Sequence, residues 1–371
     1  MNKWLADWTK RAYPDSKRDL CTCFIERGQN LTIDRGYEAL ITSDTCMYIS
    51  SFEQLRKNIL SRSTIVCFID TRGTNAHPDV FDANAGWVLH NAFAEGVKGS
   101  YFKLNQAIAA KEAGYLEALA NPDCGWLYQM QSVSFSTIPG NPISYWVTEG
   151  EINAFTNGRP ASDVVDFAQG LKPGDTERFI RAWYEVSSNS IYDLSAIPAD
   201  SDYQSYTWFR ISNGGEHRKW YGNLNDVVNW HNQGYEIRNF KDDKGKCRAR
   251  VQNERFYFKE GLTWSALTSG PISVRVNEHG IMCAGAGYFI NANDDYLKIM
   301  GFLNSSTSAQ IKKLLTESLN NEVGDLSRFP ILMNEDMATR IERIVSSCVD
   351  LCRKDWDSFE TSSSFSVNPL I

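Results

Sequence analysis

The 371-residue sequence has none of the short motifs that mark common nucleotide-binding or hydrolytic sites. It contains no GxxxxGK[ST] phosphate loop and no GxSxG nucleophile elbow. Residues 285–287 (GAG) lack the third glycine of a dinucleotide-binding loop, and the apolar residues that follow predict a tight strand bend there. These absences argue against a P-loop nucleotidase, an α/β-hydrolase and a Rossmann dehydrogenase.

Metal-binding spacing is also lacking. The nine cysteines include no CxxC pair, and the five histidines are scattered along the chain, where surface or packing roles are expected. Cys348 and Cys352 lie one helical turn apart, but two ligands alone make a poor metal site. We therefore expect no metal, and reduced cysteines packed in the core of a cytoplasmic protein.

Long apolar runs are missing as well. No stretch approaches the roughly 20 apolar residues of a membrane span, and the N-terminal residues MNKWLADW contain no apolar signal core. The net charge of -7 argues mildly against a nucleic-acid partner when it is taken alone. The prediction from these features is a soluble, cytoplasmic protein without membrane contact.

The first hundred residues alternate between helix and strand patterns. Helices are expected at 16–31, with Leu20, Cys23, Phe24 and Leu31 on one face, and at 50–60, opened by a capping box at 50–53. Strands are expected at 37–42 and 64–70, the latter (TIVCFID) apolar enough for a buried parallel strand. Residues 86–93 and 100–104 suggest a hairpin. This order predicts the edge of an α/β sheet, with too few strands for a complete doubly wound domain.

The remainder changes in texture. Residues 105–120 predict an Ala-rich connector helix, and 121–304 predict short strands with one helix at 175–184, capped by Asp175 or Thr176. Amphipathic helices are expected at 306–320 and 335–355, followed by a loosely ordered tail at 361–366.

One region combines basic and aromatic residues. Residues 208–260 hold 11 Lys and Arg against 7 Asp and Glu, interleaved with ten aromatics. Cations for phosphates and aromatic faces for bases are what nucleic-acid recognition requires. Composition leaves an alternative open, a solvated sheet face with its aromatics turned inward. Residues 241–246 are expected to be only a charged hairpin tip, whereas residues 218–221 and 248–250 are better placed for binding.

Methylation of an amino group needs an Asn/Asp-Pro-Pro-aromatic segment, whose polar groups accept hydrogen bonds from the adenine amino group. Three near misses occur, at 121–124 (NPDC), 141–144 (NPIS) and 368–371 (NPLI). None has the second proline or the aromatic, so all three are interpreted as turns.

One segment, residues 213–223 (NGGEHRKWYGN), is rich in glycine, basic and aromatic residues. Further distinctive segments are 174–179 (GDTERF), 227–230 (VVNW), 258–265 (FKEGLTWS), 323–328 (VGDLSR) and 355–361 (DWDSFET). Together, in sequence and spacing, these segments resemble the PglX-type adenine-specific DNA methyltransferases of BREX phage-defence systems, whose GGExRKWYGN segment is similar to 213–223. More loosely, they resemble the amino-methyltransferases of fused restriction–modification enzymes.

The resemblance implies a central portion of such an enzyme, beginning after the family's glycine-containing cofactor loop and NPPY segment. Residues 79–82 (DVFD) resemble the motif whose aromatic packs on the flipped adenine, which makes Phe81 the candidate base-stacking residue; the alternative is a core anchor at the sheet edge. The DNA-binding candidates are Arg218, Lys219, Trp220, Tyr221, Arg248, Arg250, Lys259 and Trp264.

The predicted architecture is an α/β partial methyltransferase sheet (its downstream half), then a mixed α+β target-recognition domain and C-terminal helices. The expected boundaries are 1–104 for the catalytic part, 105–125 for the connector, 126–304 for target recognition and 305–371 for the helical segment. No catalytic residue is predicted in this chain, and no cofactor for it alone, although the resemblance implies S-adenosylmethionine for the complete enzyme.

Three functions follow as hypotheses. The first is recognition of double-stranded DNA for an adenine-N6-specific methyltransferase, inactive alone. The second is an active enzyme when a separate S-adenosylmethionine-binding half complements it. The third is a protein-interaction scaffold within a defence complex.

Overall fold

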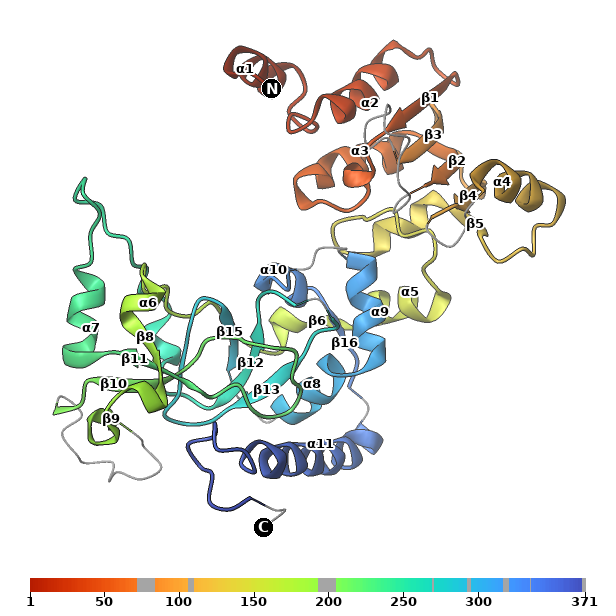
Figure 1. The fold of residues 1–371 in the computed structure, drawn as a ribbon. Coiled ribbons are helices and arrows are strands. Elements are labelled where there is room, and N and C mark those ends of the chain that lie inside the picture. The colour runs from red at the N-terminus through yellow and green to blue at the C-terminus, as the bar shows by residue number, and fades with distance from the viewer. Residues whose placement is uncertain are drawn as a thin grey trace. The chain divides into compact units, whose positions relative to one another are not determined.

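The computed structural model describes residues 1–71, 84–105, 110–192, 205–268, 270–291, 295–315, 320–333 and 335–368, and the fold is mixed α/β (Figure 1). Its contacts divide the chain into two units, Met1–Asn157 with Lys313–Glu317, and Gly158–Lys312 with Ser318–Ile371. The expected boundaries at 104 and 125 do not coincide with this division.

A five-stranded sheet forms the first unit. Its helices and strands are α1 (Lys3–Ala12), α2 (Leu20–Leu31), β1 (Tyr37–Thr42), α3 (Glu53–Arg62), β2 (Thr64–Asp70), β3 (Ala85–His90), β4 (Lys98–Lys103), α4 (Lys111–Ala120), β5 (Leu127–Gln131) and α5 (Glu149–Asn157). Short 3-10 helices lie at Asp44–Met47, Ser50–Phe52 and Ser132–Thr137. The strands predicted at 37–42 and 64–70 are confirmed with the same bounds.

The strand order β1-β3-β2-β4-β5 shows that the predicted hairpin is wrong. β3 lies between β1 and β2 and is antiparallel to both, while β4 pairs in parallel with the other edge of β2. Buried and half-buried residues alternate along β3, and this pattern is expected both for a central strand and for a strand of a hairpin. Periodicity therefore indicates that β3 is a strand but does not select its neighbours.

Two apolar clusters stabilise this sheet. One contains Ile25 from α2, Leu55 from α3 and the aromatic rings of Phe68, Trp87 and Tyr101. The other lies around Phe102, Leu104 and Ala118, where α4 packs on the sheet. The capping box expected at 50–53 is wrong, since α3 begins at Glu53 without a side-chain cap.

The second unit contains short strands and its own helices. These are β6 (Arg159–Pro160), β7 (Phe167–Ala168), α6 (Thr176–Phe179), β8 (Ile180–Ala182), β9 (Ile191–Tyr192), β10 (Trp208–Ser212), β11 (Asp226–Asn229), α7 (His231–Arg238), β12 (Gly261–Ser265), β13 (Val274–Asn277), β14 (Met282–Cys283), β15 (Gly287–Asn291), α8 (Tyr296–Leu303), α10 (Val323–Leu326), β16 (Pro330–Ile331) and α11 (Glu335–Trp356). Helix α9 (Ser306–Leu315) has its last residues grouped with the first unit.

Two larger sheets organise this unit, β14-β10-β11-β8 with β9 paired to β10, and β13-β12-β15-β7, and β16 pairs with β6 in a two-stranded sheet. The predicted cap of α6 is confirmed, because the Asp175 carboxylate accepts a hydrogen bond from the Arg178 amide, but the helix ends at Phe179 where β8 begins. The tail at 361–366 was expected to be loosely ordered, but hydrogen bonds attach it to the rest of the unit. Ser362 is buried and donates to Asp357, and the Thr361 carbonyl accepts from the Trp183 indole.

Candidate nucleic-acid interface

The loop between β10 and β11 contains the segment 213–223, and a buried arginine holds it in place. Arg275 on β13 is fully buried and donates hydrogen bonds to the carbonyls of Gly214 and Arg218, at 3.4 and 3.2 Å. Ser265 donates to the Gly215 carbonyl at 2.9 Å and accepts from Arg275. Gly214 and Gly215 both have positive φ, which lets their carbonyls point inward to these donors.

None of the described carboxylates pairs with Arg275. Burial therefore lowers the pKa of its guanidinium to about 10, because charge is disfavoured away from water. The group still carries a proton at neutral pH. Backbone carbonyl dipoles of the loop are thus its main compensation, which couples the charge of Arg275 to the loop's conformation.

The basic residues of this loop have partners inside the unit. Arg218 lies over the Trp356 ring at 5.0 Å and forms an ion pair with Asp355, both at the end of α11. Lys219 donates to the Asn304 carbonyl at 2.7 Å, at the end of α8. Both side chains keep partial exposure, but their contacts connect the loop to the ends of α11 and α8.

The aromatic candidates are mostly enclosed. Trp264 is fully buried and donates to the Asn321 carbonyl, and Tyr221 is buried with its hydroxyl donating to Glu278 at 3.2 Å. Neither ring offers a free face to a base in this conformation. Trp220 is half-buried, and its left-handed backbone pairs with β13 through Val274 and Val276. Of the ten aromatics between 208 and 260, five are buried, four are half-buried and one is exposed.

The second basic segment is different. Residues 240–250, named here the basic hairpin, contain five basic and two acidic residues. The Asp242 amide donates to the Lys246 carbonyl at 2.9 Å, and the Asp242 carboxylate accepts from the Lys244 and Lys246 amides. The hairpin follows α7 and projects from the unit (Figure 1). The predicted charged tip is confirmed as a hairpin, and its Lys and Arg side chains are exposed.

Arg248 and Arg250, both predicted for binding, lie on the returning arm of this hairpin. The Arg250 amide donates to the Lys172 carbonyl at 2.7 Å, and the Lys172 amide donates back at 3.0 Å, so two exposed cations lie side by side. Arg248 lies over the half-buried Phe240 ring at 5.3 Å. Lys259 is also exposed, while its carbonyl accepts from Asn277.

Two residues at this surface were missed by the site prediction. Lys172 lies outside the basic stretch in sequence, so only pairing with Arg250 places it here. Tyr235 on α7 is 62% exposed, in contrast to the other aromatics of the segment. Left-handed residues Asn232 to Gly234 start that helix, and Gly234 packs against Trp230, which turns Tyr235 outward.

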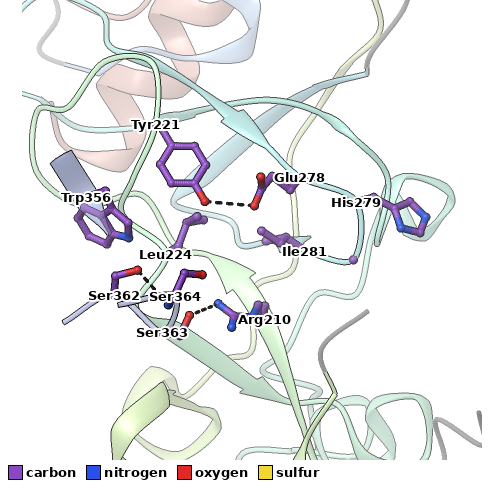
Figure 2. Close-up of a pocket in the computed structure, with 11 residues that line it drawn as sticks. Arg210, Tyr221, Leu224, Glu278, His279, Ile281, Trp356, Ser362, Ser363 and Ser364 are labelled. Carbon is purple, nitrogen blue, oxygen red and sulfur yellow. Dashed lines mark hydrogen bonds between the residues drawn. The ribbon is translucent and has the colours of Figure 1, made fainter. Parts of the chain in front are cut away.

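A small cavity beside the loop is lined by polar groups (Figure 2). Its walls include Arg210, which donates to Ser363 at 2.6 Å, and the Tyr221–Glu278 hydrogen bond. A volume of about 60 Å³ holds a few waters and is too small for a nucleobase. Burial beside Glu278 raises the pKa of the Tyr221 hydroxyl, which keeps it a hydrogen-bond donor. We therefore do not assign a nucleobase-binding role to this cavity.

Phe81 lies outside the residues that the structure describes, so the base-stacking prediction stays a prediction. No cluster of three or more His, Cys, Asp or Glu suited to a metal occurs among the described residues. Within the same residues, no helix combines the length and apolarity needed to cross a membrane. All nine cysteines are free, and Cys23, Cys46 and Cys283 are buried.

The N-terminal part of the chain has a recognisable family signature. Residues 1–77 match the model of the Eco57I restriction-modification methylase family. This match covers α1, α2, β1, α3 and β2 of the first unit. The first unit thus contains a segment similar to restriction–modification methylases.

The narrower relationship extends over the whole chain. All of it aligns with the adenine-specific methyltransferase PglX of Lacticaseibacillus casei (strain Zhang) at 32% identity, and with the adenine-specific methyltransferase BrxX of Escherichia coli O9:H4 (strain HS) at 30% identity. The chain spans 31% and 29% of these relatives. The resemblance to PglX-type adenine-specific methyltransferases is confirmed, for about three tenths of their length.

A solved structure of the Type IIL restriction-modification enzyme MmeI in complex with DNA is also similar. The structural match covers 98% of this chain and 46% of the MmeI chain, at 14% sequence identity and a TM-score of 0.49. At this distance the likeness assigns no residue a role.

Proposed function

We propose that this chain supplies target recognition on double-stranded DNA for a PglX-like, adenine-N6-specific methyltransferase of a phage-defence system. The observation that carries the proposal is the exposed basic hairpin, paired through Arg250 with Lys172 and preceded by the exposed Tyr235. Cations on a projecting hairpin contact phosphates, and an outward-facing ring contacts a base or sugar.

The complete enzyme would bind S-adenosylmethionine, because the relatives are methyltransferases. Residues 1–371 contain no glycine-containing cofactor loop and no NPPY segment. We therefore assign cofactor binding and methyl transfer to another part of the enzyme. Within the target-recognition domain expected at 126–304, we assign DNA contact to the surface around the basic hairpin.

Salt-dependent binding tests the proposal. The purified chain should bind a short duplex, measured by fluorescence anisotropy, and four phosphate contacts would weaken the binding about 100-fold between 50 and 200 mM salt. Replacing both Arg248 and Arg250 by alanine should weaken binding to all sequences and make the slope of log K against log salt shallower by about 2.

The matched control replaces two exposed arginines of α11, Arg340 and Arg343, by alanine. This control keeps the change in net charge but leaves the hairpin intact, so its salt slope should equal that of the unmodified chain. Equal slopes for all three proteins, or no binding at 50 mM salt, would contradict the proposal.

A further inference from the structure

The second unit contains a cleft that is lined by residues of α8, α11 and the end of β13. All the residues that line it belong to this unit, and they are different from those of the basic hairpin. The cleft has a volume of about 310 Å³, at the lower end of the range of small-molecule sites. It is therefore large enough for a small ligand, unlike the cavity beside Tyr221.

One part of the cleft lining is apolar. Val276 of β13 and Val349 of α11 are buried, and Leu297 of α8 is half-buried, so three elements contribute carbon atoms to the same space. We call these three residues the apolar wall. A ligand whose methylene groups lie on the apolar wall removes hydrocarbon surface from water, which favours binding.

The charged part of the lining is mainly acidic. Glu260, Glu278 and Asp350 line the cleft with a single guanidinium, that of Arg353. Arg353 donates to Glu278 at 2.8 Å, so these two charges offset each other. Glu260 and Asp350 are exposed, and neither forms an ion pair with a described cation. Two negative charges of the lining are thus available to a cation.

A tyrosine holds one of these two carboxylates at the cleft. The Tyr296 hydroxyl donates to Oε1 of Glu260 at 3.2 Å. Burial and the neighbouring Glu260 raise the pKa of Tyr296, so the hydroxyl remains a donor at neutral pH. A carboxylate accepts several hydrogen bonds, and Glu260 can therefore receive a further donor from a ligand.

The arrangement of the carboxylates does not suit a bare metal ion. Ca²⁺ and Mg²⁺ need several oxygen ligands that converge on one point. No group of three or more His, Cys, Asp or Glu in the described part of the chain converges in this way. Separate carboxylates beside an apolar wall match a cation on a carbon chain, because the chain packs on hydrocarbon while the charged end reaches polar groups.

We propose that this cleft binds an aliphatic ammonium ion, with its methylene groups on the apolar wall and its ammonium group against Glu260 and Asp350. A free alkylamine or diamine has this chemistry, and so does the lysine side chain of another protein. The inference is independent of the DNA recognition proposed for the basic hairpin.

Calorimetric titration of the whole chain with small amines at low salt tests the proposal. Butylamine and putrescine should bind with a Kd below about 1 mM, whereas butanol, which has the same chain but no charge, should not bind. From ethylamine to butylamine to hexylamine, affinity should rise about twofold to fourfold for each added methylene. An acidic surface without the apolar wall would bind the three amines equally.

The variant Glu260→Gln, Asp350→Asn removes both available charges and keeps the acceptor for Tyr296. Its affinity for butylamine should be at least about fivefold lower, because two ion pairs are lost. The matched control is Asp163→Asn, Glu177→Gln, which makes the same change in charge at exposed positions of the second unit outside the cleft. This control should bind butylamine like the unmodified chain, and both variants should keep its circular dichroism spectrum.

A short peptide with one internal lysine and blocked ends distinguishes the two sources of the ammonium ion. Affinity equal to that of butylamine supports the proposal with a protein lysine as the ligand, and binding of the free amines alone supports it with a small amine. Two results would overturn the proposal. One is equal affinity for ethylamine and hexylamine, or no binding of either. The other is equal butylamine affinity of the cleft variant, the control and the unmodified chain.

Discussion

Glu38 is a buried carboxyl group on β1, and neither of its carboxylate oxygens accepts a hydrogen bond from the described residues. Its carboxylate lies against the backbone of Gly28, where a Cβ atom would overlap it. Burial raises the pKa of Glu38 to about 7, because the ionised form loses its hydration without gaining a partner.

The sign of the stability change follows from this shift. Between pH 4.5 and 7 the unfolded chain releases the Glu38 proton before the folded chain does, so the free energy of unfolding falls as pH rises. Glu38→Gln removes this loss. The free energy of unfolding of the variant, relative to that of the unmodified protein, should therefore be higher at pH 8 than at pH 5 by about 1–3 kcal/mol.

Urea unfolding at the two pH values measures the difference, and an exposed Glu112→Gln variant in the same unit is the control. Since both glutamines are neutral at each pH, only a titrating buried carboxyl can produce the pH dependence. A constant difference between Glu38→Gln and the unmodified protein would show that Glu38 has an ordinary pKa.

Arg275 is a buried charged residue of the second unit, as Glu38 is of the first. Arg275→Met retains much of the side-chain volume but removes the donors to Gly214 and Arg218, so buried carbonyls lose their partners. The free energy of unfolding should fall by about 2–4 kcal/mol. Amides of residues 213–223 should exchange faster, as measured by mass spectrometry.

Arg343→Met, at an exposed position on α11, is the control and should change neither quantity. The exchange measurement separates the positioning of the loop from a general loss of packing. Faster exchange that is uniform over the whole unit would contradict a specific role of Arg275 in this loop.

At the scale of elements, two neighbouring strands of the first sheet approach so closely that one position has room only for glycine. Gly99 on β4 faces the parallel neighbour β2, where a Cβ atom would lie 2.1 Å from the Ile65 carbonyl oxygen. The β2–β3 register shifts at the same place, between Ile65 and Cys67. The carbonyl cannot move without disturbing the ladder, which makes glycine a steric requirement here.

Gly99→Ala should therefore lower the free energy of unfolding by more than about 2 kcal/mol. Gly150→Ala, in helix α5 of the same unit, is the control, since its Cβ atom would meet nothing closer than 4.0 Å. Alanine in that helix should be neutral or stabilise by about 0.5–1 kcal/mol. Equal effects of the two substitutions in thermal unfolding would refute the steric explanation.

Local patterns predicted many elements but few neighbours. The strands at 37–42 and 64–70, the cap at Asp175 and the long C-terminal helix follow from periodicity and capping chemistry. The pairing of β3 between β1 and β2 does not, because an alternating strand fits either arrangement. Periodicity placed Cys23, Phe24 and Leu31 on one face of α2, but only the structure shows that Cys23 is buried while Phe24 and Leu31 are exposed.

At the scale of the whole molecule, the distribution of charge matters more than its sum. The chain carries a net charge of -7, yet exposed cations gather on the basic hairpin with Lys172. Charges of opposite sign elsewhere are screened beyond about 10 Å at moderate salt. A local basic surface on an acidic chain is therefore compatible with the salt-dependent DNA binding proposed above.

The sequence by itself determined the mixed α/β class, the kinship with adenine-specific methyltransferases and the residue types available for recognition. It did so because motifs and periodicity are local properties of the chain. Only the tertiary structure decided which of those residues are accessible. Trp264 and Tyr221 pack inward, and Arg218 and Lys219 contact the ends of α11 and α8. The cations of the basic hairpin are exposed. Burial depends on contacts between distant segments, which the order of residues does not display.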